Sequence, residues 1–327
     1  MMRLKQIVIA TWILGYIFGS LTFADPRPVV GSNEKSQKAA ERPDGLVPLN
    51  KQETVLLDTK GKRVLVRSKV VLREGMLEMF ACPKQTKEHE SILAVDAKAY
   101  TIHAGLLAIR AKPGKPVQFY KQDPDEPGKY VEDFKPPTGQ RLNIFVQWKD
   151  KQGKRHRVSA KSWVRYAINR FYVETMDRLP RDLTIPKKGD LRSLGYDERH
   201  KELSWFGPVS ENKRDQLLKL SSDQHYRKAI NSFFKQSRPR EMEADWIFAG
   251  SRFFKDEKTQ KRYYEAEVGT LICVANFPSA MIDISEKSSD QQAEGMLYEA
   301  YTNRIPPVDT EVTIELIPVF EKPKKTR

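Results

Sequence analysis

The clearest strand pattern in the sequence is Arg141-Leu142-Asn143-Ile144-Phe145-Val146-Gln147-Trp148-Lys149. Every second residue is apolar, which is the pattern of a strand with one face in the core and one in water. The same alternation returns in residues 311–316, and shorter β-rich runs separated by turn residues occupy 54–58, 63–72 and 77–82. The sequence therefore predicts a sheet as the main framework.

Helical segments are few and short. Residues 100–111 carry apolar side chains at helical spacing and stop before Pro113-Gly114, and residues 159–171 show a similar stripe. Residues 211–236 indicate a helical hairpin, with Ser210 and Ser222 as caps. The predicted fold class is α+β, a mostly antiparallel or mixed β-sheet with a few short helices and one helical insertion.

Composition limits the class of protein. The chain has 327 residues, of which 39% are hydrophobic and 31% charged, and its mean hydropathy is -0.61. These values exclude a protein with many membrane spans. Its two cysteines are too few for a four-thiolate iron–sulfur or zinc site. We expect no metal and no cofactor, with a site at His89, Glu90 and His103 as the alternative.

The N-terminus has the pattern of an export signal. Arg3 and Lys5 precede an uncharged run at 7–23, and Ala24 provides the small residue that a signal peptidase needs. We expect a signal peptide at 1–24 with cleavage after Ala24. The alternative is an uncleaved anchor, because this uncharged, mostly apolar run of 17 residues reaches the lower limit for a span. Both predict export, to the periplasm, the cell envelope or the medium.

The exported part remains basic, with a formal net charge of +12 once Arg3 and Lys5 are removed from the total of +14. Expected partners are an unidentified envelope ligand or protein, or an anionic surface of lipid or acidic polysaccharide. Membrane contact is expected only through an uncleaved N-terminus. Residues 149–157 form a basic run that we interpret as a solvated hairpin tip.

Aromatic and basic residues interleave at 252–255 and 261–264, a pattern that could bind single-stranded nucleic acid. Packing across a hairpin explains this pattern better, because residues 256–260 have turn character. Export also argues against nucleic acid, and none is expected as a partner.

Several motifs resemble the YdjY-domain family, especially the exported members of planctomycete-type bacteria. They are Leu-Glu-Met-Phe-Ala-Cys-Pro at 77–83, His-Ala-Gly-Leu-Leu-Ala at 103–108, Ile-Cys-Val-Ala-Asn-Phe-Pro-Ser-Ala-Met at 272–281, and Glu-Ala-Tyr-Thr-Asn-Arg-Ile-Pro-Pro at 299–307. The resemblance extends over roughly 65–172 and 244–318. It implies no particular reaction, because the family has no established activity. Some members carry a ferredoxin-type label, for which this chain lacks the cysteines.

The resemblance also suggests a domain organisation. We expect a YdjY-like α+β domain at 51–321, interrupted by an insertion at 174–243. Residues 25–50 are expected to be a flexible linker and 322–327 a charged tail. The insertion holds 15 Lys plus Arg and 12 Asp plus Glu. We expect its apolar helical stripe to dock on the host domain, with docking on a partner as the alternative.

Cys82 and Cys273 are expected to form a disulfide, because an exported protein meets an oxidising compartment. Two alternatives remain, a pair of buried inert thiols and a reactive thiol. In the second, Cys82 would be a nucleophile with His89 or His103 as its base. No protease signature surrounds Cys82.

A candidate ligand face consists of His89, Glu90 and Ser91 together with His103. Imidazole and carboxylate can bind a metal or a polar ligand, although the spacing matches no metalloprotease pattern. Alternatively, these side chains only fix a loop through hydrogen bonds. We therefore expect no catalytic residues and predict a non-catalytic binding or structural module of the envelope. The rival hypothesis is a metal- or thiol-dependent enzyme that uses the region of Cys82, His89 and His103.

Overall fold

The computed structural model describes residues 45–126, 128–289 and 296–320. Eight strands of its largest sheet close into a barrel, because β3 pairs with β21 on one side and with β5 on the other. Two neighbouring pairs, β4 with β5 and β18 with β19, are parallel, and the others are antiparallel. The order around the barrel is β3 (Arg63–Val70), β21 (Glu311–Pro318), β9 (Thr138–Lys149), β15 (Trp246–Phe248), β19 (Ile282–Ile284), β18 (Ile272–Cys273), β4 (Met79–Pro83) and β5 (Ser91–Val95).

Closure of this sheet corrects the predicted fold class. Strand accounts for 37% of the structure and helix for 17%, so the protein is a barrel-dominated β protein and not α+β. The sequence correctly predicts strands near 54–58, 63–72, 77–82, 141–149 and 311–316. Pairing between β3 and β5 closes the ring, and alternation along single strands carries no signal for such a contact.

The barrel core follows the alternation seen in the sequence. The buried residues of β9 are Leu142, Ile144 and Val146, and those of β21 include Val312, Ile314 and Leu316. Phe80 packs against Trp163 and Trp246, with ring centroids 6.3 and 5.5 Å apart. Truncating an aromatic ring in such a core costs about 3–5 kcal/mol, so these rings are major contributors to stability.

Helix α1 (Ala99–Ala108) confirms the helix predicted at 100–111 and packs against β3 and β2 (Val55–Asp58). Gly105 lies so close to the sheet that a Cβ there would stand 2.8 Å from Leu49 Cδ1. At the other end, the Glu267 carboxylate accepts hydrogen bonds from the backbone N–H groups of Ala99 (3.1 Å) and Tyr100 (3.0 Å). This carboxylate satisfies donors that a helix N-terminus leaves unpaired.

The helix predicted at 159–171 is wrong. The chain instead runs through the end of β10 (Arg155–Ser159), a 3₁₀ turn η2 (Ala160–Trp163) and β11 (Val164–Tyr166) before β12 (Phe171–Thr175). Strand β11 pairs with β20 (Tyr298–Ala300), more than 130 residues later in the chain. This distant pairing outweighs a local helical spacing of apolar residues.

The insertion has a hydrophobic core of its own. Strands β12, β14 (Glu202–Phe206) and β13 (Leu194–Asp197) form a three-stranded sheet, and α2 (Glu211–Leu218) and α3 (Gln224–Gln236) complete the cluster. The helical hairpin is therefore confirmed. Ser210 caps α2 as predicted, whereas Asp223 and not Ser222 caps α3. The expected docking on the host is wrong, because the buried face of α3 packs against this small sheet.

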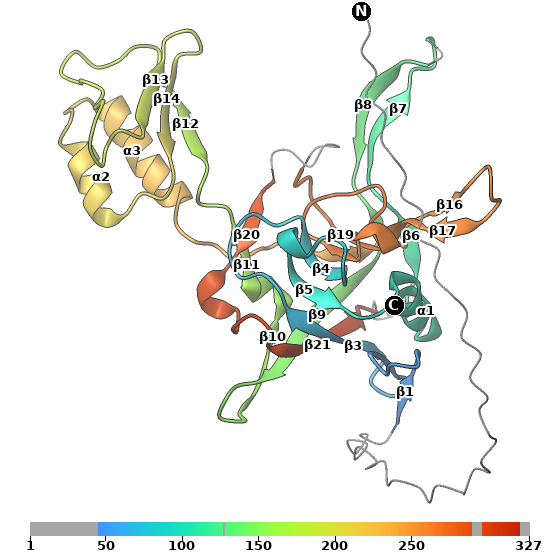
Figure 1. Cartoon of the computed structure of the whole chain (residues 1–327). Helices are drawn as coiled ribbons and strands as arrows, with labels where there is room; N and C mark the ends of the chain where they lie inside the picture. Colours follow the sequence, from blue (N-terminus) through green and yellow to red (C-terminus); the bar gives the residue numbers. More distant parts are fainter. Residues whose placement is uncertain (1–44, 127, 290–295, 321–327) are drawn as a thin grey trace, which may run out of the picture. The chain divides into compact units, whose positions relative to one another are not determined.

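The remaining elements extend the sheet or form hairpins. Leu46–Pro48 (β1) pairs with β2, so this part of the segment predicted as linker is a strand of the sheet. The basic run at 149–157 belongs to the β9–β10 hairpin, as predicted. The others are β6 (Pro113–Lys115), β7 (Gln118–Gln122), β8 (Tyr130–Lys135), β16 (Phe253–Lys255), β17 (Arg262–Tyr264), η1 (Glu88–Glu90), η3 (Glu265–Val268) and η4 (Thr302–Arg304). Figure 1 shows the β7–β8 and β16–β17 hairpins projecting from the barrel.

Helices α1, α2 and α3 and the 3₁₀ turns of the described ranges are all too short or too polar to cross a membrane. The predicted signal peptide at 1–24 and the charged tail at 322–327 lie outside the described residues.

Candidate functional site

Two of the predicted site residues, His89 and Glu90, lie on the 3₁₀ turn η1. The His89 side chain is 73% exposed, and its Nε2 lies 3.7 Å from Glu90 Oε2. Ser91, the next residue, is fully buried at the start of β5, where its hydroxyl donates a 2.9 Å hydrogen bond to the Leu93 carbonyl. Burial removes Ser91 from any ligand in solvent and gives it a structural role.

Glu90 belongs to a small charged cluster with Glu78 and Lys87. The Lys87 ammonium pairs with the Glu78 carboxylate, lies 3.9 Å from Glu90 Oε2 and also stands over the Phe277 ring. Burial, followed by the neighbouring Glu78 carboxyl, raises the pKa of Glu90. Lys87 thus attracts the carboxyl groups of both Glu78 and Glu90, and these contacts fix the turn that carries His89.

His103 lies on α1 in different surroundings. Its Nδ1 is 2.7 Å from the Tyr264 hydroxyl, and its ring packs edge-on against Phe248 and Tyr264. Burial lowers the pKa of His103, which favours the neutral ring. His103 thus has aromatic neighbours, whereas the neighbour of His89 is the Glu90 carboxylate.

Cys82 and Cys273 reach the same small cluster, with Met79 and Ala280, but they are free thiols. The strand register gives the reason. Cys273 pairs with Met79 across β4 and β18, so Cys82 lies three positions farther along its strand. The predicted disulfide is absent from the structure, because a bridge needs the two Cβ atoms nearly opposite each other.

Burial raises the pKa of the Cys82 thiol and raises that of the Cys273 thiol well above its ordinary value. For Cys273 the carboxyl of Asp283 acts in the same direction. Both groups are therefore held as neutral thiols, whereas a nucleophilic cysteine needs a stabilised, accessible thiolate. This environment does not favour the thiol-enzyme hypothesis.

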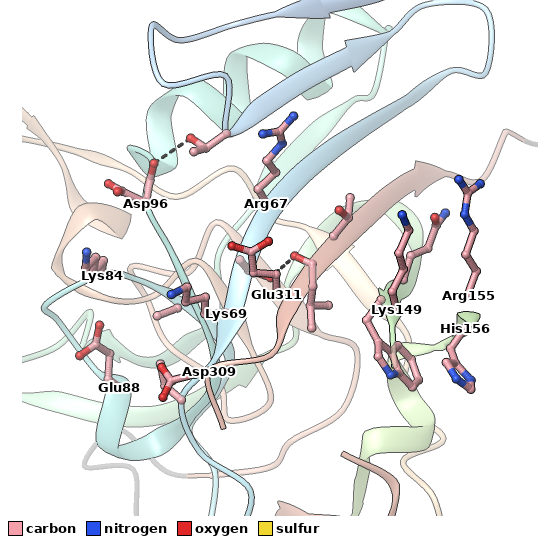
Figure 2. A pocket seen from close by; sticks show the side chains of 18 residues that line it. Arg67, Lys69, Lys84, Glu88, Asp96, Lys149, Arg155, His156, Asp309 and Glu311 are labelled. Atoms are coloured by element: carbon pink, nitrogen blue, oxygen red, sulfur yellow. Dashed lines mark hydrogen bonds between the residues drawn. The ribbon is translucent and has the colours of Figure 1, made fainter. Parts of the chain in front are cut away.

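A groove of about 990 Å³ lies beside η1 and across the outer side of the barrel (Figure 2). Its walls come from β3, β5, β9, β10, β21 and the loops next to them. It is lined by Thr54, Arg67, Ser68, Lys69, Val71, Lys84, Glu88, Ala94, Asp96, Gln147, Trp148, Lys149, Arg155, His156, Asp309, Glu311, Val312 and Thr313. Five of these side chains are cationic at neutral pH, and we define Arg67, Lys69, Lys84, Lys149 and Arg155 as the groove cations.

Strand periodicity places several groove cations on the outer face. On β3, Val66, Ser68 and Val70 are buried, so the intervening Arg67 and Lys69 point outward. Lys69 is opposite Glu311 of β21, and Lys149 of β9 is opposite Arg155 of β10. The cationic groups therefore come from four parts of the sequence that the barrel brings together.

None of the five groove cations forms an ion pair within the part of the chain that the structure describes. Two other arginines of the same sheet are paired. Arg63 Nη1 and Arg157 Nη2 lie 3.2 and 2.7 Å from the carboxylate of Glu315, which is fully buried. The sheet thus neutralises Arg63 and Arg157 internally and leaves the groove cations available to a ligand.

The charge of the groove differs between its two ends. Asp96, Asp309 and Glu88 lie on one side in Figure 2, together with Lys84, whereas Lys149, Arg155 and His156 lie on the other. His156 Nε2 is 2.7 Å from the Asp150 carboxylate, and its ring stacks on Trp148 at 4.8 Å. An anionic group would therefore find its most favourable position between Lys149 and Arg155.

The sequence pointed to His89, Glu90, Ser91 and His103 and missed this groove. Its only signal was the basic run at 149–157, which contains Lys149 and Arg155 but is typical of a solvated hairpin tip. The other groove cations are single residues separated along the chain. In the described ranges, no group of three or more His, Cys, Asp or Glu side chains is placed to hold a metal ion.

Residues 55–178 match the family model described as the YdjY domain. No curated protein and no solved structure matches the chain. The matched segment contains all five groove cations and the barrel strands β3, β4, β5 and β9. The other four barrel strands, β15, β18, β19 and β21, lie between residues 246 and 318, beyond the match.

Proposed function

The chain carries a YdjY domain at residues 55–178, and from this premise we propose that it is a non-catalytic binding module of the cell envelope that holds an extended anionic ligand in the groove. Carboxylate, sulfate or phosphate groups of the ligand would contact the groove cations. The ligand is an envelope polymer or protein segment, and the binding module is exported by its N-terminal signal.

One observation carries this proposal. Five cationic side chains line one groove, and none of them is neutralised by a carboxylate of the described chain. Glu311 is opposite Lys69 in the strand register yet forms no ion pair with it. A ligand with several negative charges gains attraction from each cation, and the open groove lets those charges act together.

The surroundings of the reactive side chains support a binding role rather than catalysis. The thiols of Cys82 and Cys273 are buried with raised pKa values, and Ser91 is buried too. His103 is committed to the Tyr264 hydroxyl, apart from the groove. Besides its cations, the groove contains the contact groups Trp148 and Gln147 and four carboxyl groups. Its one histidine, His156, is held by the Asp150 carboxylate and stacks on Trp148.

Binding to polygalacturonate, a carboxylated polysaccharide, tests the proposal, with neutral dextran as the reference polymer. We expect the full chain to bind polygalacturonate and to release it as salt is added, because salt screens exposed charges. The double variant Lys149→Gln/Arg155→Gln should bind about tenfold more weakly, at about 0.7 kcal/mol for each exposed ionic contact.

The matched control is Lys187→Gln/Lys188→Gln, which removes the same charge from exposed positions outside the groove. This control should bind as the parent does. Equal losses in both double variants would mean that net charge alone attracts the polymer, and would refute a groove site. Binding to dextran as strong as binding to polygalacturonate would refute the anionic ligand.

A further inference from the structure

The β16–β17 hairpin exposes aromatic rings on both of its faces. Phe254 and Tyr263 are paired across the strands and are 54% and 51% exposed. On the opposite face Phe253 is 47% exposed, and it contacts Tyr100 of α1, which is 52% exposed, with ring centroids 6.0 Å apart. Large apolar rings in water carry a hydrophobic cost, so their gathering here points to a partner.

The same hairpin is rich in cations that have no carboxylate partner. Within the described chain, Lys255, Lys258, Lys261 and Arg262 form no ion pair, and the Arg262 guanidinium lies 4.9 Å from the Phe253 ring centroid. The Asp256 carboxylate is used inside the turn, where it accepts a 2.6 Å hydrogen bond from the Thr259 N–H. The hairpin therefore presents four cations to a partner. Besides Asp256, the turn at 256–260 contains one acidic residue, Glu257.

The base of the hairpin is fixed to the barrel and to α1. The Tyr264 hydroxyl donates a 2.9 Å hydrogen bond to the Gly250 carbonyl and lies 2.7 Å from His103 Nδ1. The Tyr264 ring also packs against Tyr100 and Phe253. These contacts give His103 a role as an anchor of the hairpin, and they hold the exposed rings in place before any partner binds.

We propose that the β16–β17 hairpin, together with Tyr100, is a peripheral membrane contact that binds a bilayer surface rich in anionic lipid. A bilayer interface can surround a projecting hairpin and contact the rings on both of its faces. A single docked protein would cover only one face. Aromatic rings favour the bilayer interface, and lysine and arginine beside them attract anionic headgroups. This contact uses other residues than the groove and does not depend on the proposed function.

A tryptophan reporter in the full chain tests the proposal at the hairpin itself. Phe254→Trp places the reporter on the hairpin, and Phe206→Trp places it at a 47% exposed position of β14 as the matched control. With vesicles of phosphatidylcholine and phosphatidylglycerol in equal amounts, we expect a blue shift and quenching by brominated lipid for Phe254→Trp only. The five native tryptophans, including Trp12 of the N-terminal segment, are present in both variants, so the signal of the hairpin is the difference between Phe254→Trp and Phe206→Trp.

Charge removal provides the second arm. In the Phe254→Trp background, Lys255→Gln/Lys261→Gln should lower partitioning into these vesicles about thirtyfold, at about fivefold for each cation near the surface. An unshifted Phe254→Trp emission overturns the proposal, and so does an equal shift at Phe206→Trp. A response to soluble polyglutamate in place of vesicles also overturns it, because the partner would then be an acidic polypeptide.

Discussion

Asn276 Nδ2 donates a 3.1 Å hydrogen bond to Asp283 Oδ1 in the interior of the protein, while Asp283 Oδ2 has no partner among the described residues. The backbone N–H of Ile284 also donates to Oδ1, at 2.8 Å. Burial raises the pKa of Asp283 to about 7, and these hydrogen bonds only partly oppose it. The same Asn276 amide accepts from the N–H and hydroxyl of Ser288, so this carboxyl lies beneath a hydrogen-bonded loop.

The raised pKa of Asp283 predicts that the stability of the folded protein depends on pH. This pKa is about 7 in the folded protein and about 3.9 in the unfolded chain, so between these values the folded state binds more protons. The contribution of the neutral carboxyl is complete below about pH 4 and is lost as the pH rises to about 7, a change of order 4 kcal/mol. Urea unfolding of the parent should therefore show a lower free energy of unfolding at about pH 8 than at about pH 5.

Asp283→Asn should remove most of this difference, because the amide does not ionise. Asp245→Asn is the control. Lys161 and Arg141 lower the pKa of Asp245, so this carboxyl titrates below the pH range that is compared. The control should keep the parent's slope between about pH 5 and about pH 8. A parent-like slope in Asp283→Asn would assign the pH dependence to another group.

Removing the negative charge of Glu315 should lower the stability of the protein strongly. The buried Glu315 carboxylate pairs with both Arg63 and Arg157, and Arg157 also stacks on Phe145 at 3.8 Å. Glu315→Gln leaves two arginines without their shared partner and should lower the free energy of unfolding by about 3 kcal/mol. Glu311→Gln, four residues earlier on β21, removes an exposed carboxylate without an ion pair and should change it by less than about 0.5 kcal/mol. Equal effects in urea unfolding would contradict this difference.

The fold could be predicted from sequence as far as its strands and not as far as their closure. Alternation at Leu142, Ile144 and Val146 marks a half-buried strand whatever sheet contains it. The pairs that close the ring join residues far apart in the chain, such as Ile314 with Val66. The pattern of apolar residues along one strand does not indicate which distant strand pairs with it. For the same reason the helical spacing at 159–171 predicted a helix that the structure does not contain.

The candidate site was harder to predict, for a physical reason that Arg67 and Arg155 illustrate. Each is an exposed cation on a strand, and an exposed arginine is ordinary on a protein surface. Their importance comes from their common groove, in which neither arginine forms an ion pair with a carboxylate of the described residues. By contrast, His89 and His103 attract attention by residue type, but the structure gives them different neighbours.

Cys82 and Cys273 should behave as two buried free thiols. Their strand register keeps them from facing each other, and both are fully buried. We expect iodoacetamide to leave both unmodified in the native protein and to modify both after denaturation without reductant. Intact mass measures the number of alkyl groups. A denatured chain that alkylates only after reduction would show a disulfide and would mean that β4 and β18 pair in another register.

Replacement of residues 169–238 by a short Gly-Ser linker should leave the barrel folded. The main barrel core includes no residue between 167 and 241, whereas the insertion buries Trp205, Tyr226 and Phe233 in its own cluster. Closing the gap requires little rearrangement, because the Tyr166 N–H donates a 2.9 Å hydrogen bond to the Arg240 carbonyl.

For this shortened chain we expect cooperative urea unfolding with a smaller m-value, because less surface becomes exposed when fewer residues unfold. Its midpoint should remain close to that of the parent's barrel transition. Near-ultraviolet circular dichroism should keep the signal of the packed rings Trp163 and Trp246, which lie outside the deleted segment. The full chain with Trp205→Ala provides the comparison, since it should destabilise the insertion by about 3–5 kcal/mol and spare the barrel. Loss of the near-ultraviolet signal in the shortened chain would show that the barrel depends on the insertion, and that the two hydrophobic clusters fold as one unit.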